Sequence, residues 1–270
     1  MANTFFDKYG SWAVITGASS GIGAEYAKQI ATKGLNIVLV ARRKARMEAL
    51  ASELEQNFKI QTKIIECDVA IDGFHDIILN AVKDLDIGLL INNAGINCEG
   101  QFFRGDLARN TQMIQVNVKA PFVLAYEFAK KFVEKGKGGI IFTSSISAFN
   151  AHPYLTHYAA TKAYILSLAE GMNYEFKDKN IDILALCPGM TKSEMTKGMK
   201  DSIILMEVQP VVETALAALG NSAVVVPGFI NKFQTFVNSR VLGRISARNF
   251  SGALLERVLP GVKSKKGKSK

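Results

Sequence analysis

The sequence has few cysteines and no long apolar run. Its three cysteines, Cys67, Cys98 and Cys187, stand far apart and form no C-x-x-C pair. This spacing excludes a disulfide framework and a cysteine-based zinc site, so we expect a reducing, cytoplasmic setting and no bound metal. No apolar run approaches the roughly 18 residues of a membrane-spanning helix, and the first residues reach a glycine turn too early for a signal peptide.

The sequence also lacks repeats and low-complexity linkers that would divide it. With 270 residues, of which 48% are hydrophobic, it can bury a large core. We expect a single domain over residues 1–262, including a helical extension from about residue 228. Five lysines fall within residues 263–270, so much of the net charge of +9 belongs to a basic, flexible tail. A nucleic-acid reader instead concentrates charge and aromatics on one folded face, so no nucleic-acid partner is expected.

Short apolar runs alternate with segments long enough for helices. The predicted strands are Trp12–Thr16, Asn36–Ala41, Lys63–Cys67, Gly88–Asn92, Gly139–Ser144, Asp182–Cys187 and Ser222–Val226. The predicted crossover helices include Arg43–Asn57, Asp72–Lys83, Leu107–Glu134 and Thr156–Lys177. This alternation predicts an α/β fold with a doubly wound parallel sheet and helices on both faces. Ligands bind at the carboxyl ends of such strands, so we expect the functional side chains just after each strand.

A glycine-rich turn follows the first predicted strand. Residues 16–23 read Thr-Gly-Ala-Ser-Ser-Gly-Ile-Gly and lead into a helical stretch. Glycines let the backbone approach a ligand closely, and the free N–H groups at a helix start attract an anion. The turn is therefore a candidate phosphate cradle, although an ordinary tight βα turn would look the same. Its candidate cofactor residues are Gly17, Ser19, Ser20, Gly21, Ile22 and Gly23.

The residues after the second predicted strand favour NADP over NAD. An NAD site usually has an acidic residue here for the ribose hydroxyls, whereas an arginine accommodates the 2′-phosphate of NADP. This sequence has Ala41 and then Arg42. Solvated charges at a helix start are the alternative, but basic residues there oppose the helix dipole.

Small polar residues close the third and fourth predicted strands. Asp68 and Val69 follow the third, and residues 92–95, Asn-Asn-Ala-Gly, end the fourth. Both of these strand-end segments lie at the sheet edge where an adenosine would bind. Each segment also fits an Asx turn that ends a strand.

An asparagine interrupts the longest predicted helix. Asn117 precedes Pro121 by four residues, so the Asn117 carbonyl loses its helical donor. A free carbonyl and an amide side chain inside a helix can hold an ordered water, and a simple helix kink is the alternative.

A serine, a tyrosine and a lysine follow the fifth predicted strand. Ser145 comes directly after it, and Tyr158 and Lys162 stand four residues apart on the next helix. Positions four apart share a helix face, so the ammonium can lie beside the phenol and lower the phenol pKa from about 10. Such a phenol donates a proton to a carbonyl or accepts one from an alcohol. The same pair also occurs by chance on solvated helix faces.

Together these residues resemble the short-chain dehydrogenase/reductase family over roughly residues 10 to 230. The matching motifs are Thr16-Gly-x-x-x-Gly-x-Gly23, Asn92-Asn-Ala-Gly95, Asn117, Ser145, Tyr158-x-x-x-Lys162 and Pro188-Gly189. The resemblance implies a Rossmann-type sheet of about seven strands and a nicotinamide cofactor. It also implies an oxidoreductase that moves hydride between that cofactor and a ketone or secondary alcohol. Residues 34–42 look like the branch of hydroxysteroid dehydrogenases and 3-ketoacyl reductases.

The resemblance further implies a role for each matching residue. Tyr158 is the general acid and base, Ser145 orients the substrate oxygen, and Lys162 binds the nicotinamide ribose and lowers the tyrosine pKa. Asn117 holds the water of a proton relay. Beyond the glycine turn and Arg42, the implied cofactor contacts are Asp68 and Val69 beside the adenine, Asn93, Ala94 and Gly95 along the ribose, and Tyr158, Lys162 and Thr191 at the nicotinamide end.

Two further features bear on the cofactor and the substrate. Ser20 stands where some NADP enzymes of the family have a basic residue, which leaves Arg42 more of the phosphate contact. The region that the family uses as a substrate lid is apolar here and predicts a lipophilic substrate, steroid-like or an acyl-chain carbonyl, although a lid packed on the core would look the same. Its apolar residues are Met190, Met195, Met199, Ile203, Ile204, Leu205 and Met206.

The end of the chain is longer than the family core requires. Apolar residues from Phe229 to Ile245 fall broadly on one helical side, and Arg240, Arg244 and Arg248 follow at four-residue steps. Such an amphipathic helix can lie on an anionic membrane, close the substrate pocket or form a subunit interface. Family members are commonly dimers or tetramers, so a homodimer or homotetramer is expected.

Two rival functions stay open from the sequence. A non-enzymatic member of the family would keep the fold as a nucleotide-sensing or membrane-docking module, but it has no need for the complete set Asn117, Ser145, Tyr158 and Lys162. Nucleic-acid binding through the tail would require a strongly salt-dependent affinity that is lost without residues 263–270.

Overall fold

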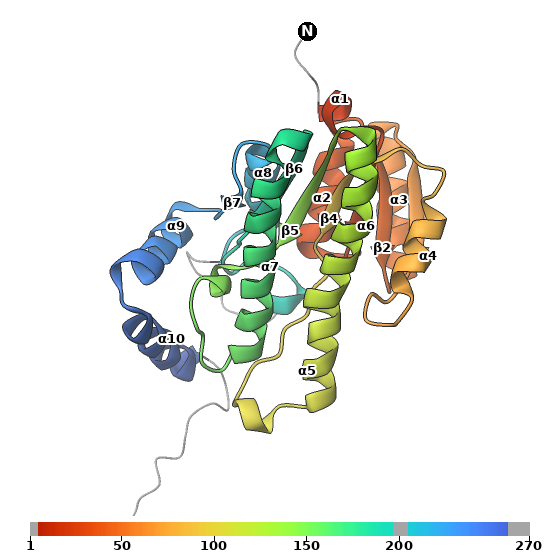
Figure 1. The fold of residues 1–270 in the computed structure, drawn as a ribbon. Helices are drawn as coiled ribbons and strands as arrows, with labels where there is room; N and C mark the ends of the chain where they lie inside the picture. Colours follow the sequence, from red (N-terminus) through yellow and green to blue (C-terminus); the bar gives the residue numbers. More distant parts are fainter. Residues whose placement is uncertain (1–4, 197–204, 259–270) are drawn as a thin grey trace, which may run out of the picture.

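A seven-stranded parallel sheet forms the centre of the protein (Figure 1). A computed structural model of the chain gives this fold, and the structure describes residues 5–196 and 205–258. The strand order is β3-β2-β1-β4-β5-β6-β7, so the winding direction reverses between β1 and β4 and the predicted doubly wound α/β fold is confirmed. The strands are β1 Trp12–Thr16, β2 Asn36–Ala41, β3 Thr62–Glu66, β4 Ile87–Asn92, β5 Gly138–Thr143, β6 Ile181–Leu186 and β7 Val224–Val225.

Helices cover both faces of the sheet. One face packs against α4 Phe74–Ala81, α6 Ala120–Lys135 and α7 Thr156–Phe176. The other packs against α1 Phe5–Tyr9, α2 Gly21–Ala31, α3 Lys44–Phe58 and α8 Val208–Ala218. In Figure 1, α6 and α7 lie in front of the sheet and α2 lies behind it.

The central strands are buried on both sides. Val14 of β1 and Val38 of β2 are in register and join one helix layer, whereas the next pair, Ile15 and Leu39, joins the other. Because helices cover both faces of the sheet, these strands are continuous apolar runs in the sequence. The boundaries predicted from these runs for β1 and β2 are therefore the observed ones.

The predicted strand Ser222–Val226 is shorter in the structure. Only Val224–Val225 forms β7, which pairs with β6 through Ala185 and Leu186. The strand lies at the sheet edge with one neighbour, and Pro227 follows it without a backbone donor.

The predicted helix Leu107–Glu134 is interrupted. It consists of α5 Leu107–Ile114, a π-helical turn η2 Gln115–Lys119, and α6. Pro121 cannot donate to the Asn117 carbonyl, and the chain takes a wider turn in which the Ala120 N–H donates to the Gln115 carbonyl. This turn buries Asn117, which is 1% exposed, beside the end of the sheet.

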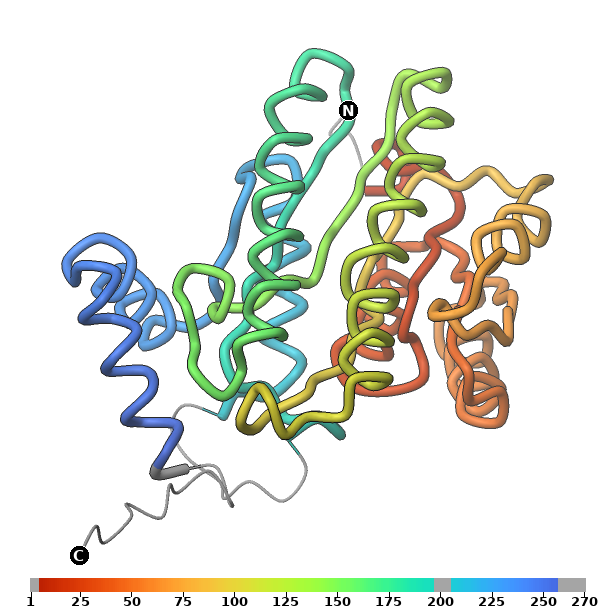
Figure 2. Tube along the Cα trace, turned by 60° about the horizontal axis from the view of Figure 1, so that its bottom comes forward, coloured from red at the N-terminus to blue at the C-terminus, as the bar shows by residue number. Residues whose placement is uncertain are grey.

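The predicted single helix from Phe229 to Ile245 is wrong. The structure has α9 Phe229–Phe236, a π-helical turn η6 Val237–Val241, and α10 Arg244–Val258. Leu242 is extended, with φ −82° and ψ 136°, and Gly243 follows it, so Arg240 does not share a helix with Arg244 and Arg248. Figures 1 and 2 show α9 and α10 in blue at one side of the molecule, beyond α7.

Two parts of the sequence predictions lie outside the described residues. These are the basic tail 263–270 and the apolar residues Met199, Ile203 and Ile204 of the expected substrate region. Among the helices of the described ranges, none combines the length and the apolar character needed to cross a bilayer.

Candidate active site

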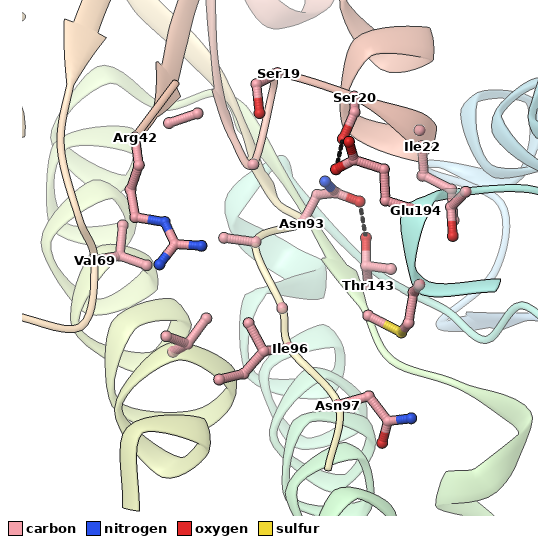
Figure 3. Close-up of a pocket in the computed structure, with 18 of the residues that line it drawn as sticks. Ser19, Ser20, Ile22, Arg42, Val69, Asn93, Ile96, Asn97, Thr143 and Glu194 are labelled. Atoms are coloured by element: carbon pink, nitrogen blue, oxygen red, sulfur yellow. Dashed lines mark hydrogen bonds between the residues drawn. The ribbon is translucent and has the colours of Figure 1, made fainter. Parts of the chain in front are cut away.

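A cavity of about 670 Å³ opens at the carboxyl ends of the central strands, as Figure 3 shows from close by. This is the sheet edge at which the fold predicts a ligand. Most of the expected cofactor residues line it: Gly17, Ser19, Ser20, Gly21, Ile22, Arg42, Asp68, Val69, Asn93, Ala94, Gly95, Tyr158, Lys162 and Thr191. Three expected site residues, Gly23, Asn117 and Ser145, are not among its lining residues.

The glycine turn is packed too closely for side chains at two of its positions. Gly17 has a φ of +68°, and a Cβ there would lie 2.9 Å from the Ala94 Cα. A Cβ at Gly23 would collide with the Gly17 carbonyl oxygen. Gly23 therefore serves the packing of the turn against α2 and does not contact the cavity.

The start of α2 leaves its backbone donors available to a ligand. Ser20 is the residue at the N-cap, but its side chain makes no capping hydrogen bond. Uncapped N–H groups and the positive end of the helix dipole form a site for a phosphate group. The bare backbone at Gly17 and these open donors fit the pyrophosphate of a dinucleotide.

The Asn93 side chain ties three strand ends together. Its Nδ2 donates to the Thr16 carbonyl at 3.2 Å, and its Oδ1 accepts from the Thr143 hydroxyl at 3.3 Å (Figure 3). The backbone N–H of Asn93 donates to the Thr16 hydroxyl at 3.0 Å. Asn93 thus fixes the cavity wall, and Thr143 joins the site as a residue that the sequence reasoning missed.

Arg42 and Arg43 line the end of the cavity that follows β2. Arg42 reaches into the cavity beside Val69 (Figure 3), where its Nη1 lies 3.7 Å from Asp68 Oδ2. Arg43 also lines the cavity, and its guanidinium contacts Ser19 and Ser20. The sequence reasoning missed Arg43 and Arg46, although both belong to the basic run that starts at Arg42.

The structure brings Ser145, Tyr158 and Lys162 together. Ser145 precedes the short 3-10 helix η3 Ile146–Ala148, and its hydroxyl hydrogen-bonds the Tyr158 phenol. Lys162 follows Tyr158 by one helical turn of α7, and its Nζ lies 5.6 Å from the centre of the Tyr158 ring. The Lys162 ammonium donates to the Thr143 carbonyl at 2.8 Å, which holds it at the end of β5.

Burial dominates the electrostatics of this group. It raises the pKa of Tyr158 to about 12, although the hydrogen bond with Ser145 acts in the opposite direction. It lowers the pKa of Lys162 to about 8. The expected net lowering of the Tyr158 pKa is therefore wrong for the protein without a ligand, because burial, the largest cause, raises it. The contribution expected from Lys162 stays a prediction. At neutral pH the phenol keeps its proton, so Tyr158 can act as a proton donor.

Asn117 lies behind this group and is held firmly. Its Oδ1 accepts from the Ile96 N–H at 2.9 Å, and its Nδ2 donates to the Ile96 carbonyl at 2.9 Å and to the Thr161 hydroxyl at 3.1 Å. A Cβ on Gly95 would lie 3.5 Å from both Asn117 Oδ1 and Lys162 Nζ, so both polar groups approach this glycine. The water expected at the Asn117 carbonyl stays a prediction.

A second hollow of about 280 Å³ adjoins the cavity and shares Asn97, Glu99 and Arg109 with it. Its wall also contains His157, whose Nε2 lies 3.0 Å from the Asn110 carbonyl oxygen. Sequence reasoning gave no sign of Asn97, Glu99 or Arg109, because they stand in irregular backbone between elements or on an exposed helix.

Helix α9 and the turn η6 pack on the protein with polar side chains. Asn231 and Asn238 are buried, whereas Phe229 is 82% and Phe233 62% exposed. The Asn231 side chain lies so close to Gly189 that a Cβ there would collide with it. Of the described residues of α9 and α10, none lines either cavity, so their apolar side chains do not close the site in this chain.

Comparison with known proteins agrees with this geometry. The family described as short chain dehydrogenase matches residues 11–203. A 7beta-hydroxysteroid dehydrogenase of Clostridium sardiniense is 32% identical over 187 residues, which cover 69% of this chain and 72% of that protein. A very-long-chain 3-oxoacyl-CoA reductase-like protein of Arabidopsis thaliana is 31% identical over 239 residues, 85% of this chain and 77% of that protein. Both relatives belong to the branch that the sequence resembles.

Among solved structures, a short-chain dehydrogenase from Sphingobium yanoikuyae in complex with NADPH superposes with a TM-score of 0.75. It is 29% identical, and the alignment covers 95% of this chain and 100% of that one. Most of the fold therefore has a counterpart in a solved structure.

Proposed function

Because this chain belongs to the short-chain dehydrogenase family, we propose that it is an NADP(H)-dependent oxidoreductase acting on a ketone or secondary alcohol. The observation that carries the proposal is the meeting of Ser145, Tyr158 and Lys162, of which Tyr158 and Lys162 line the cavity. The nicotinamide supplies or accepts the hydride when it is bound. The protein supplies the proton and the orientation of the substrate.

Each of the three side chains has a distinct task in this proposal. The Ser145 hydroxyl holds the substrate oxygen next to the Tyr158 phenol. In reduction the phenol donates its proton to that oxygen, and in oxidation the phenolate accepts it back. The Lys162 ammonium stabilises the phenolate, since this cation is buried and its Nζ lies 5.6 Å from the centre of the Tyr158 ring. Asn117 and a water behind Lys162 return the proton from solvent.

The preference for NADP(H) is supported by charge at the adenosine end. Arg42 reaches into the cavity after β2, where the chain has no carboxylate at Ala41, and Arg43 stands beside it. The related protein bound to NADPH adds support from outside the chain.

Titration with NADPH and NADH tests this preference. We expect NADPH to bind more tightly, and Arg42→Ala to weaken NADPH binding by about tenfold with little change for NADH, because only NADPH carries the 2′-phosphate. Lys44→Ala is the matched control, since Lys44 is exposed, pairs with Glu48 and does not line the cavity. Equal dissociation constants for the two cofactors in the unaltered protein would contradict the preference.

A lipophilic substrate, steroid-like or an acyl-chain carbonyl, is supported by Met195 at the cavity wall and by the names of the two relatives. A panel of lipophilic ketones, followed by the loss of NADPH absorbance, tests it. A purely nucleotide-binding protein would bind NADPH and consume none with any of them.

Exposed apolar side chains support two proposals on assembly and location. Phe122 and Tyr126 stand exposed on α6. Covering them with a second copy of the chain would give the expected homodimer or homotetramer, which light scattering measures.

Phe229 and Phe233 stand exposed on α9, and residues 214–255 contain no Asp or Glu. We propose that this cationic, apolar side of a cytoplasmic protein contacts anionic lipid, which sedimentation with anionic and neutral vesicles measures.

A further inference from the structure

Ser20, Arg43 and Arg46 form a corner beside the cavity that attracts anions, and a carboxylate of the chain, that of Glu194, already occupies it. Glu194 begins the short turn η5 Glu194–Thr196, which follows β6, and it reaches across to the β2–α3 corner. Its two oxygens accept from Arg43 Nη1 at 2.8 and 2.6 Å and from Arg46 Nη1 at 2.5 Å. The Ser20 hydroxyl donates to the same carboxylate at 3.2 Å (Figure 3).

The groups around Glu194 are those that would bind a phosphate. Two guanidinium groups and a hydroxyl from separate parts of the chain converge on one anion, and a guanidinium fork fits carboxylate and phosphate oxygens equally. The Arg43 guanidinium also contacts the Ser19 hydroxyl of the glycine turn at 2.8 Å. This corner is therefore built into the wall of the cofactor cavity, not set on a remote surface.

The three charged side chains are within reach of a ligand. The side chains of Arg43, Arg46 and Glu194 are 42%, 52% and 47% exposed. Exposed ion pairs exchange partners readily, because water screens the charges whether they are paired or separated. The two arginines also hold the pKa of Glu194 down at about 2, so the competing group carries a full negative charge throughout the neutral range.

We propose that Glu194 is an internal competitor for the cofactor 2′-phosphate and so determines how strongly the protein prefers NADP(H) to NAD(H). The inference rests on the proposed NADP(H) dependence. The 2′-phosphate takes over Arg43 and Arg46 and must displace the Glu194 carboxylate. NAD(H) has no such group and leaves the three ion-paired side chains as they are. The chain thus lowers its own affinity for NADP(H) by occupying the phosphate corner.

Binding of two small nucleotides by the full-length protein tests this without any turnover. The probes are 2′,5′-ADP, which carries the 2′-phosphate, and 5′-ADP, which does not. We expect Glu194→Gln to tighten 2′,5′-ADP binding by about three- to tenfold in calorimetry and 5′-ADP binding by less than about twofold. Glutamine keeps the size and polarity of the side chain and removes only its charge.

Glu207→Gln is the matched control. Glu207 lies in the same stretch after β6, but its carboxylate pairs with Lys192 at 2.6 Å and does not line the cavity. We expect it to leave the ratio of the two dissociation constants unchanged. In the double variant Glu194→Gln with Arg43→Ala, the gain for 2′,5′-ADP should disappear, because the released guanidinium is what binds the phosphate.

The outcomes separate this inference from the proposal beneath it. If Glu194→Gln leaves the ratio unchanged or weakens 2′,5′-ADP binding while Arg42→Ala still weakens it, Glu194 only anchors its loop, and the NADP(H) preference stands. If both nucleotides bind equally well to the unaltered protein and to every variant, no 2′-phosphate is recognised, and the proposed preference fails together with the inference.

Discussion

Replacing Tyr158 by phenylalanine should lower the rate of ketone reduction by about a thousandfold or more, with NADPH binding retained. Phenylalanine keeps the ring that packs at the start of α7 and removes only the hydroxyl that Ser145 contacts. The variant therefore lacks the group that donates the proton to the substrate oxygen in this proposal. The rate is measured from the loss of NADPH absorbance, and the dissociation constant of NADPH from fluorescence.

Tyr164→Phe is the matched control for this variant. Tyr164 lies on the same helix, is 43% exposed and does not line the cavity, so its hydroxyl should be dispensable. If Tyr158→Phe kept substantial activity, or if both variants lost activity equally, Tyr158 would not be the proton donor.

Replacing Lys162 by methionine should lower the rate of reduction by about a hundredfold and make the protein more stable. The rate falls because the phenolate left after proton transfer loses its neighbouring cation. Stability rises because the native protein holds this ammonium in a buried place, which lowers its pKa from 10.5 to about 8. After subtracting the lost hydrogen bond to Thr143, we expect a gain of about 1–2 kcal/mol at pH 7.

The sign of this stability change depends on pH. Between pH 8 and the unfolded pKa of 10.5, the unfolded lysine binds a proton that the native one has released, so the unfolding free energy of the unaltered protein rises with pH. The advantage of Lys162→Met should therefore be largest below pH 8 and shrink above it. Lys177→Met, at an exposed lysine just after α7, is the control. A destabilised Lys162→Met protein at pH 7 would contradict the assignment of a buried, costly ammonium.

Most of the fold could be predicted from local pattern. Strands buried on both faces give apolar runs that stand out from the amphipathic helices, so β1 and β2 were located at their observed ends. Pro121 marked the interruption of the helix at Asn117, but its π-helical form depends on a local hydrogen-bond pattern that hydrophobic periodicity does not encode. Prediction failed at Leu242, where extended backbone ends the helix expected from Phe229 to Ile245.

The site could be predicted where its residues follow strands or share a helix face. Ser145, Tyr158 and Lys162 come together for that reason. The direction in which the Tyr158 pKa shifts could not be predicted. The sequence shows that a lysine is nearby, but it does not show how deeply the phenol is buried. Glu194 could not be found either, since 151 residues separate it from Arg43 and no motif marks it.

The pH dependence of the two reaction directions tests the central claim most directly, namely that Tyr158 holds the exchanged proton beside Lys162. With pKa values of about 12 for the phenol and about 8 for the ammonium, both groups are protonated at neutral pH. We predict that the reduction rate is constant below pH 8 and falls above it, and that the oxidation rate, which needs the phenolate, rises with pH. A reduction rate that rises with pH, or an oxidation rate that falls, would contradict the account.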